Sequence, residues 1–389
     1  MRVLLISPLR GLDPPCGDIT YTETLQQHPP EGVVYETYAE AIERGALVEH
    51  ARRSSFCREP VLTIASKAVN LLRKRRWLFW EPFRFFSVKP GEYDLIHLHV
   101  FNARFFGLAC PLVVSSGAPQ RDVYLDRRHY QRRWVDLVEI CERLLCRVFQ
   151  MNHNSYQFPQ AQKILVYTEY FRDYLVNNGY AEAWRVAVVP ILSLMPSINI
   201  KPRPPKRIGF VAHDFDAKSG PTVLEAYKQI RKQRPDVELW IVGSPPQLSP
   251  QERDQLRITW LNTVPREQLL GEIMPSFDIF AYPTPHDCFS YVTLEAMSCG
   301  VAIATSDYVS MPEAVDYGRA GLISPVGDAA GLAKNILTLL DPQSNFKFRL
   351  AARKRFDEHF SWNSVAPRIL DNYEEAIKIY QSRPGNCTS

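Results

Sequence analysis

Hydrophobic runs separated by breaker-rich loops recur along the whole chain. Continuous apolar runs predict buried strands in the first half at residues 3–7, 93–99, 111–117, 163–168 and 185–192. Similar runs predict strands in the second half at 207–212, 237–243, 279–282 and 301–305. Helical patterns follow two of these strands, at 221–233 and 291–299. Strands that alternate with helices are typical of parallel sheets in α/β proteins.

A proline-rich stretch interrupts this pattern near the middle of the chain. Four prolines lie between Met195 and Lys206, where no hydrophobic period is present. Such a composition favours a semi-rigid linker. Because 389 residues exceed one typical core, we expect two domains, at 1–200 and 201–363.

The stretch from residue 279 to 307 concentrates the candidate chemistry. A short strand, a turn rich in prolines, a helix capped by Ser290 and stopped by Gly300, and a second strand follow one another. Asp287 lies in the turn and Glu295 lies on the helix, eight positions later. In parallel sheets, ligands bind beyond the carboxyl ends of the strands, which is where this turn lies. Carboxylates accept bonds from hydroxyls, and helix N–H groups bind phosphates. Alone, each carboxylate also fits an ordinary solvated position.

The same residues resemble a known signature. The run from Asp287 to Gly300 is similar to E-x-F-G-x-x-x-x-E-A-M-A-x-G of the family-4 retaining glycosyltransferases of GT-B fold. Phe289 and Glu295 match, whereas Asp287 replaces the first Glu and Ser290 replaces Gly. The resemblance implies two facing doubly wound, Rossmann-like domains with a cleft between them. It also implies that a C-terminal helix, at 364–382, returns to the first domain.

Other motifs of the family appear with departures. In the pattern G-R-L-x-x-x-K-G, Lys218 matches, His213 replaces Arg, and Ser219 replaces Gly. Since histidine is only partly charged at neutral pH, His213 predicts pH-sensitive phosphate binding. Gly17 matches one glycine of the family's first loop, and the serines near Ser116 stand where the family has a histidine. The resemblance implies a donor site formed by Gly17, His213, Lys218, Val264, Asp287, Cys288, Phe289, Ser290, Tyr291 and Glu295.

The function implied is metal-independent, hexosyltransferase-like sugar transfer from a UDP- or GDP-linked donor, with no cofactor. Lys218 and Asp287 are the implied catalytic residues: Lys218 stabilises the leaving diphosphate and Asp287 orients the sugar. Glu295 accepts from the ribose hydroxyls. Two alternatives stay open: a nucleotide-sugar epimerase of the same fold, which needs no acceptor, and a non-catalytic partner subunit, which the motif departures suggest.

The segment Leu71–Lys89 combines six basic residues with six large aromatic ones. Basic residues beside Trp and Phe are typical of segments that lie on anionic membranes. We therefore expect contact with a membrane or a lipid-linked acceptor, which would suit glycolipid or cell-envelope glycan synthesis. The alternative is that the aromatic rings belong to the core and the basic residues flank them.

Composition adds three exclusions. A net charge of +4 gives no reason to expect nucleic acid as a partner. The eight cysteines have no zinc-finger spacing. His97 and His99 share one strand face, but no third ligand is evident, which favours packing or crevice lining over a metal site. The short first apolar run and the lack of a membrane-length run predict a cytoplasmic protein, in peripheral contact with the inner membrane face.

Overall fold

The structure is a computed structural model that describes residues 1–7, 17–50, 84–99, 103–116, 137, 140, 157–191, 193, 198–285, 287 and 289–382. Its contacts divide the chain into two units. The first comprises residues 1–189 with 366–389, and the second comprises residues 190–365. The chain therefore enters the second unit from the first and returns to the first at its C-terminal end.

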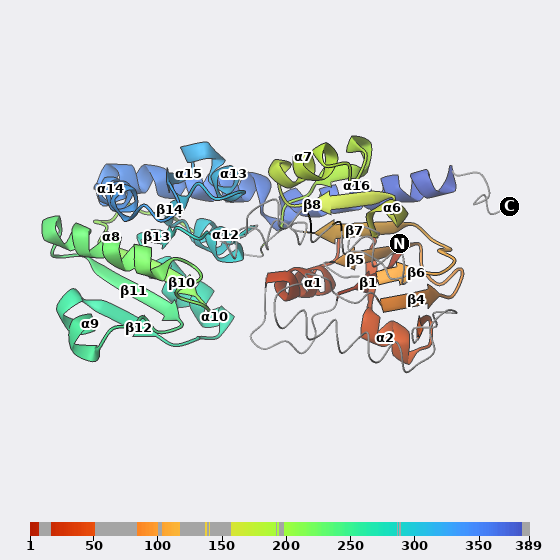
Figure 1. Ribbon diagram of the computed structural model, residues 1–389, viewed down its shortest axis with the longest axis horizontal. Coiled ribbons are helices and arrows are strands. Elements are labelled where there is room, and N and C mark those ends of the chain that lie inside the picture. Colours follow the sequence, from red (N-terminus) through yellow and green to blue (C-terminus); the bar gives the residue numbers. More distant parts are fainter. Residues whose placement is uncertain are drawn as a thin grey trace. The chain divides into compact units, whose positions relative to one another are not determined.

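The first unit is built on a six-stranded parallel sheet in the order β2-β1-β5-β7-β8-β9 (Figure 1). Every residue of β5, β7 and β8 is buried, as expected for strands covered on both faces. The strands predicted in this half are confirmed. Their bounds are β1 (Arg2–Ile6), β5 (Leu95–His99), β7 (Leu112–Ser116), β8 (Lys163–Val166) and β9 (Val186–Val188). The strand β2 (Val34–Thr37), which pairs with β1, was not predicted.

Short helices connect these strands, and capping residues define their ends. Thr37 and Glu40 form a capping box at the start of α2, and the Thr168 hydroxyl accepts from the Phe171 N–H at the start of α7. The described helices of this unit before its C-terminal segment are α1 (Gly17–Gln27), α2 (Tyr38–Glu43), α6 (Gln157–Gln160), α7 (Glu169–Asn177) and η2 (Ala183–Arg185).

A second, three-stranded sheet corrects part of the expectation for the segment Leu71–Lys89. Its strands are β3 (Leu47–His50), β4 (Arg84–Val88) and β6 (Ala103–Phe105), in the order β3-β4-β6. Phe86 on β4 has no exposed surface, and its ring packs against Phe105 at a centroid distance of 6.0 Å. The Phe86 ring therefore belongs to the core, as the alternative to a membrane-contacting segment predicted for the aromatic rings. Residues 71–83, with the basic run and both tryptophans, lie outside the described residues.

A buried polar network connects the C-terminal helix α16 (Trp362–Gln381) to the first sheet. The Tyr373 hydroxyl lies 2.5 Å from His97 Nδ1, and the Ser115 hydroxyl lies 2.7 Å from His97 Nε2 and 2.7 Å from His99 Nδ1. Burial, with a smaller effect of nearby His99, lowers the pKa of His97 to about 3. His97 is thus neutral at physiological pH, and both rings take part in packing, as predicted.

The second unit is a six-stranded parallel sheet in the order β12-β11-β10-β13-β14-β15. The first strand in sequence therefore lies in the middle, and the order reverses between β10 and β13. This is the 3-2-1-4-5-6 arrangement of Rossmann-like sheets. The strand bounds are β10 (Arg207–Ala212), β11 (Glu238–Gly243), β12 (Ile258–Leu261), β13 (Ile279–Tyr282), β14 (Ala302–Ser306) and β15 (Leu322–Ser324).

Helices surround this second sheet (Figure 1). Helix α14 contacts α8 and the strands β13, β14 and β15, whereas α15 contacts α12 and β14. The helical segments are α8 (Gly220–Gln233), α9 (Pro250–Leu256), α10 (Arg266–Gln268), η3 (Leu269–Ile273), α11 (Met274–Ser276), α12 (Tyr291–Ser298), α13 (Met311–Ala314), η4 (Asp316–Gly318), α14 (Ala329–Leu339) and α15 (Pro342–His359).

The described part of the expected linker is held firmly to the second unit. The buried carboxylate of Asp278 accepts bonds from Arg203 Nε at 2.5 Å and from the backbone N–H groups of Lys206 and Arg207 at 2.9 Å. Each of these bonds is charge-assisted, which makes it stronger than a neutral one. Residues 198–206 therefore form part of the second unit, and residues 194–197 lie outside the described part of the chain.

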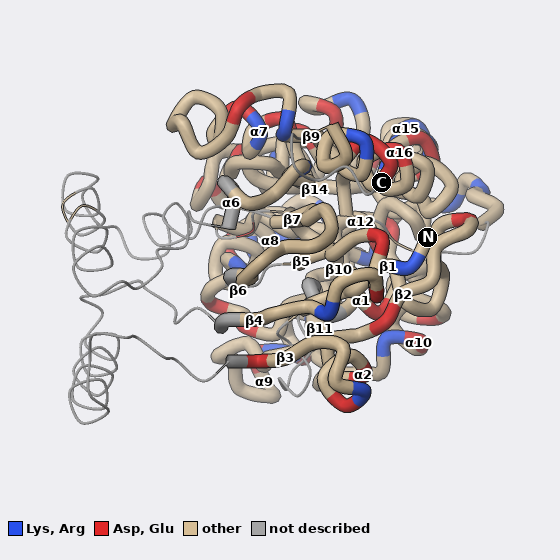
Figure 2. The backbone as a smooth tube through the Cα atoms, turned by 90° about the vertical axis from the view of Figure 1, so that its right-hand side faces the viewer, with Lys and Arg blue, Asp and Glu red and all other residues tan. Residues whose placement is uncertain are grey.

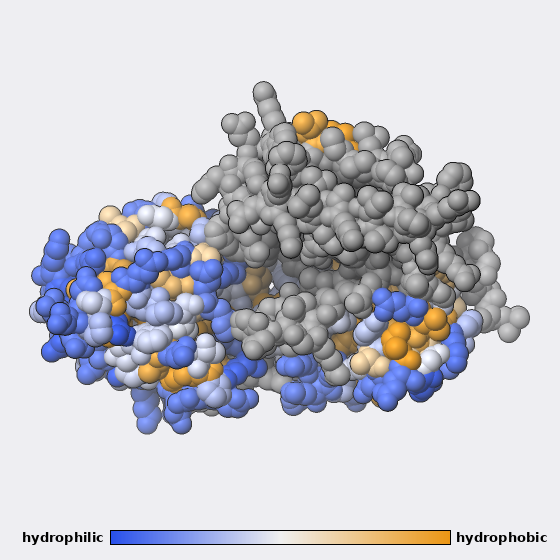
Figure 3. Space-filling model, turned by 60° about the horizontal axis from the view of Figure 1, so that its bottom comes forward, coloured by the Kyte–Doolittle hydropathy of each residue, from blue (hydrophilic) through white to orange (hydrophobic). Residues whose placement is uncertain are grey.

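The surface of the described residues carries both signs of charge. Positions of lysine and arginine and positions of aspartate and glutamate are interspersed along the described part of the chain (Figure 2). On the face drawn in Figure 3, hydrophobic residues form small groups among hydrophilic ones. Among the described helices, none combines the length and the apolar character that a bilayer span requires.

The close approach of β10 and β11 generates a prediction about stability. Gly243 ends β11 with φ of +110°, and a Cβ there would overlap the carbonyl oxygen of Ala212 on β10. We expect Gly243→Ala to lower the free energy of unfolding by about 2–3 kcal/mol, measured by urea denaturation of the full chain. Gly271→Ala is the control, since no atom lies within 4 Å of the added Cβ. Equal effects of the two substitutions would contradict the prediction.

Candidate functional site

The candidate site lies in the second unit, where the order of the strands reverses. Strands β10 and β13 pair directly, with Ile208 opposite Ile279 and Gly209 opposite Phe280. Because all six strands are parallel, the loops that follow them emerge at one edge of the sheet. Such a reversal point is where open α/β sheets bind ligands.

The loop after β10 is a tight turn that presents Lys218. The Asp214 carboxylate accepts the Ala217 N–H at 2.9 Å, and the Asp214 carbonyl accepts the Lys218 N–H at 3.2 Å. Ser219 then adopts φ of +62°, in the left-handed region that favours glycine. The family motif has glycine at this position, so the backbone conformation agrees with the match at Lys218.

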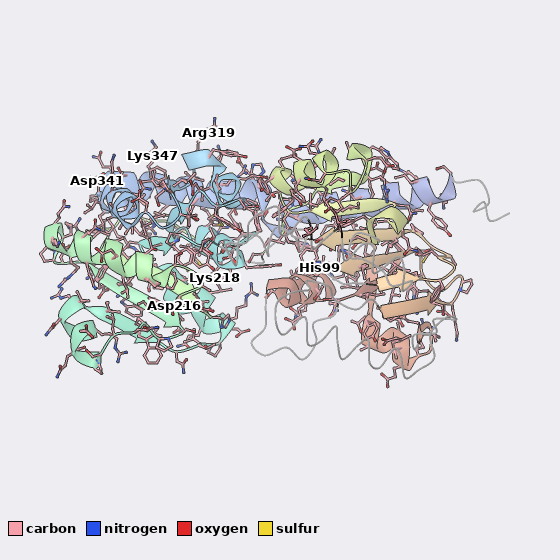
Figure 4. All side chains as sticks on the ribbon, in the orientation of Figure 1. His99, Asp216, Lys218, Arg319, Asp341 and Lys347 are labelled. Atoms are coloured by element: carbon pink, nitrogen blue, oxygen red, sulfur yellow. The ribbon has the colours of Figure 1, made fainter. Side chains whose placement is uncertain are left out.

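Lys218 and Asp287 come together although they are far apart in sequence. The Lys218 ammonium forms an ion pair with Asp287 Oδ1, and the Tyr282 hydroxyl donates to Asp287 Oδ2 at 2.7 Å. The Lys218 and Asp287 side chains are 22% and 19% exposed, so water reaches this pair only in part. The site therefore holds one carboxylate between a cation and a phenol. Figure 4 shows Lys218 on the loop before α8.

Tyr282 was not predicted as a site residue. It is the last residue of the buried strand β13 and is itself 3% exposed. Burial first, and then the neighbouring Asp287 carboxylate, raise the pKa of Tyr282 well above its usual value. The phenol therefore stays protonated and remains a donor. A tyrosine placed at the carboxyl end of a buried strand, directly before a candidate loop, is the sequence signal that could have indicated it.

Glu295 forms the second ion pair of the site. The carboxylate, on α12, is buried, and its Oε1 accepts from Arg266 Nε at 3.0 Å and from Arg266 Nη2 at 2.8 Å. Burial raises the pKa of Glu295, and the Arg266 charge and hydrogen bonds act in the opposite direction. Arg266 begins α10 and was also not predicted. No local pattern connects it to a glutamate on another helix.

The start of α12 confirms the predicted cap. Ser290 Oγ accepts from the Thr293 N–H at 3.2 Å, and Gly300 ends the turn after the helix with φ of +62°. Phe289 precedes the cap, and its ring lies 5.7 Å from that of Phe360. Tyr291 is the first helical residue. The backbone N–H groups of Phe289, Ser290 and Tyr291 lie at the N-terminal end of α12, where the positive end of the helix dipole favours anions.

The other expected donor residues lie on separate elements of the chain. His213 directly follows β10 and is exposed, and its carbonyl accepts from the Ser244 hydroxyl. Val264 is partly exposed in the loop between β12 and α10. Gly17 begins α1 in the first unit. Cys288 lies outside the described residues.

The arrangement combines acceptors for hydroxyls with donors for anions. Asp287 and Glu295 are the carboxylates, and Lys218 and Arg266 are the cations. All four lie on loops or helices that connect the strands of the second sheet. A ligand with both hydroxyl and phosphate groups matches this chemistry, because carboxylates accept from hydroxyls and cations bind phosphate oxygens.

Comparison with known proteins places the candidate site within a segment that matches a family model. Residues 205–342 match the model of the family described as glycosyl transferases group 1. This segment contains Lys218, Arg266, Asp287 and Glu295. A phosphatidyl-myo-inositol mannosyltransferase of Mycolicibacterium smegmatis is 28% identical over 208 residues, which cover 49% of this chain and 52% of the relative. The chain thus spans about half the length of the curated relatives it matches.

Solved structures extend the likeness to both units. A sucrose-phosphate synthase from Thermosynechococcus elongatus superposes with a TM-score of 0.62 at 18% identity, covering 97% of this chain and 99% of that chain. Anabaena HepE, solved in complex with UDP-glucose, superposes with a TM-score of 0.59 at 15% identity, covering 96% and 99%. At these identities the likeness concerns the fold. The segment 205–342 is therefore similar to the group 1 glycosyltransferases, and the chain has the α/β, two-domain GT-B fold that the family-4 resemblance implies.

Proposed function

We propose that this protein transfers a sugar from a nucleotide-sugar donor to an acceptor, with retention at the anomeric carbon and without a metal ion. The observation that carries the proposal is the Lys218–Asp287 pair at the reversal point of a Rossmann-like sheet. The pair belongs to the segment that matches the group 1 glycosyltransferases. The presence of UDP-glucose in the HepE structure supports a nucleotide sugar as the ligand.

In this proposal the cationic side of the site holds the leaving group. As the bond from the anomeric carbon to the diphosphate breaks, negative charge develops on the diphosphate oxygens. Lys218 stabilises that charge, with help from His213 and from N–H groups at the start of α12, near Phe289 and Ser290. Groups that are already oriented toward the developing charge contribute most to such catalysis.

The carboxylates hold the hydroxyls of the donor. Glu295 accepts from the ribose hydroxyls, and Asp287 accepts from hydroxyls of the transferred sugar. Val264 contacts the base. The complete proposed donor set is Gly17, His213, Lys218, Val264, Asp287, Cys288, Phe289, Ser290, Tyr291 and Glu295.

Incubation with UDP- and GDP-linked sugars tests the reaction class. Slow release of the nucleotide diphosphate, as the donor is hydrolysed, supports a transferase. Conversion of the sugar into its epimer, without an acceptor, would instead support an epimerase. Donor binding without any turnover would support a non-catalytic partner subunit.

The first prediction concerns the nucleotide. Lys218→Ala and Glu295→Ala should each weaken binding by about 1.5–3 kcal/mol, the range for a hydrogen bond to a charged group. Isothermal titration against UDP and GDP measures the loss. Lys347→Ala is the control, because this exposed lysine lies on α15, away from Lys218 (Figure 4). If both site variants bind like the control, the donor site is elsewhere.

A second prediction concerns pH. Burial raises the pKa of Glu295, and Arg266 opposes this shift. In Arg266→Gln the opposing charge is lost, so Glu295 takes up a proton at a higher pH than in the wild type. A protonated carboxyl accepts hydroxyl bonds less well. Nucleotide affinity of the variant should therefore fall severalfold more than that of the wild type as pH is lowered. Arg319→Gln, at an exposed ion pair with Asp316, should keep the wild-type profile.

We further propose that the acceptor is lipid-linked and that the protein works at the cytoplasmic face of a membrane. The support is the basic and aromatic composition of residues 71–83, outside the described residues, and the similarity to a phosphatidyl-myo-inositol mannosyltransferase. Rings can lie at the level of the lipid headgroups while cations face anionic lipid. Each basic residue near such a surface contributes about 1 kcal/mol.

Sedimentation with anionic vesicles tests this placement. The wild-type protein should pellet with the vesicles, and less of it should pellet at high salt, because salt screens the attraction. A variant with Arg73, Lys74, Arg75 and Arg76 changed to Ser should remain in the supernatant. A wild-type protein that stays in the supernatant at low salt would indicate a soluble acceptor.

A further inference from the structure

Tyr282 is fixed by the core of the second unit rather than by the site it faces. Its ring stacks on Phe280 at a centroid distance of 5.5 Å and packs at a tilt against Phe210 at 6.1 Å. Its backbone carbonyl accepts from Thr305 Oγ1 at 2.9 Å on the neighbouring strand β14. The hydroxyl therefore reaches the site from a side chain whose ring and backbone are held by packing and a hydrogen bond in the core.

The two groups that hold the Asp287 carboxylate differ in how easily a bound ligand can draw them away from it. Lys218 lies on the loop after β10 and has a flexible aliphatic stem, and its side chain is 22% exposed. The diphosphate of a donor carries more negative charge than one carboxylate, so it competes for Lys218. Tyr282 ends a buried strand and is 3% exposed, and its bond to Oδ2 at 2.7 Å has the length of a hydrogen bond to a charged acceptor.

We propose that Tyr282 is a positioning residue that fixes the orientation of the Asp287 carboxylate toward the transferred sugar while the donor diphosphate occupies Lys218. This inference rests on the proposed function and deepens it, because it separates the hold on the sugar from the hold on the diphosphate. Without the phenol, the carboxylate can turn about its side-chain bonds and follow Lys218 toward the diphosphate. The donor then stays bound through its diphosphate, but the hydroxyls of its sugar lose the oriented Asp287 carboxylate as their hydrogen-bond acceptor.

A purely structural role for Tyr282 makes a different prediction. In that case the hydroxyl only satisfies a buried polar position, together with the electrostatic contacts of Ser290 and Thr284. Its removal would then lower stability without any selective effect on the sugar. Tyr227 provides the matched comparison, since its buried phenol donates to the Val237 carbonyl at 3.1 Å and to the Leu256 carbonyl at 2.7 Å, away from the site residues.

The experiment compares affinities of the full chain for UDP and UDP-glucose, and for GDP and GDP-mannose. The ratio of the two dissociation constants in each pair isolates the contribution of the sugar. Tyr282→Phe keeps the ring and should leave the affinity for the nucleotide diphosphate unchanged. It should reduce the contribution of the sugar, and should lower kcat of donor hydrolysis by about tenfold or more, the loss expected for a hydrogen bond to a charged group.

Three further variants make the outcome specific. Tyr227→Phe should change none of these ligand parameters, even if it lowers stability. Lys218→Ala should weaken binding of the nucleotide diphosphate itself, which Tyr282→Phe should leave unchanged. In Asp287→Asn, the additional change Tyr282→Phe should have little further effect on the sugar, because both substitutions act through the same carboxylate.

The results also separate the two proposals. If the wild type binds a donor and Tyr282→Phe matches it in sugar contribution and kcat, the positioning role is overturned and the proposed function stands. If Tyr282→Phe weakens the nucleotide diphosphate as much as the donor, Tyr282 supports the site as a whole, and the positioning role is again overturned. If the wild type binds none of the four ligands, the proposed function fails, and this inference fails with it.

Discussion

The parallel pairing of β10 with β13 is the constraint on which the site depends. It brings together the loops that carry Lys218 and Asp287, two residues 69 positions apart in the chain. The pairing needs a small residue, because a Cβ at Gly209 on β10 would overlap the ring of Phe277. A shift of register between these strands would move Asp287, together with Tyr282 on β13, away from Lys218. The chemistry of the site is thus a consequence of strand packing.

Features that depend on local sequence could be predicted. The apolar runs gave the central strands, since burial on both faces demands continuous hydrophobic residues. Ser290 and Gly300 marked the two ends of α12, because capping and left-handed φ are decided within one turn of helix. The strands β2, β3, β6, β12 and β15 were missed, as three or four residues are too few to establish a period. Phe86 was placed in an expected interfacial segment, because a buried ring and an interfacial ring look the same in sequence.

Partnerships between distant side chains could not be predicted in the same way. Lys218 and Glu295 were found through their motif positions, but their partners Tyr282 and Arg266 have no motif of their own. Which phenol or guanidinium reaches a carboxylate depends on how strands and helices are placed in three dimensions. The resemblance indicated that Asp287 is shorter than the glutamate of the family. The structure adds that a phenol and a cation hold the shorter side chain.

The two ion pairs of the candidate site also bear on selectivity. Lys218 with Asp287, and Arg266 with Glu295, satisfy one another, so a ligand must replace the interactions it disrupts. A free phosphate compensates the cations but leaves the carboxylates without donors, and a free sugar does the reverse. Since a buried charge without a partner is costly, either half-ligand loses part of what it gains. A nucleotide sugar carries diphosphate oxygens and hydroxyls on one molecule, and so compensates both members of each pair. The pairing of each carboxylate with a cation therefore favours a ligand with both kinds of group.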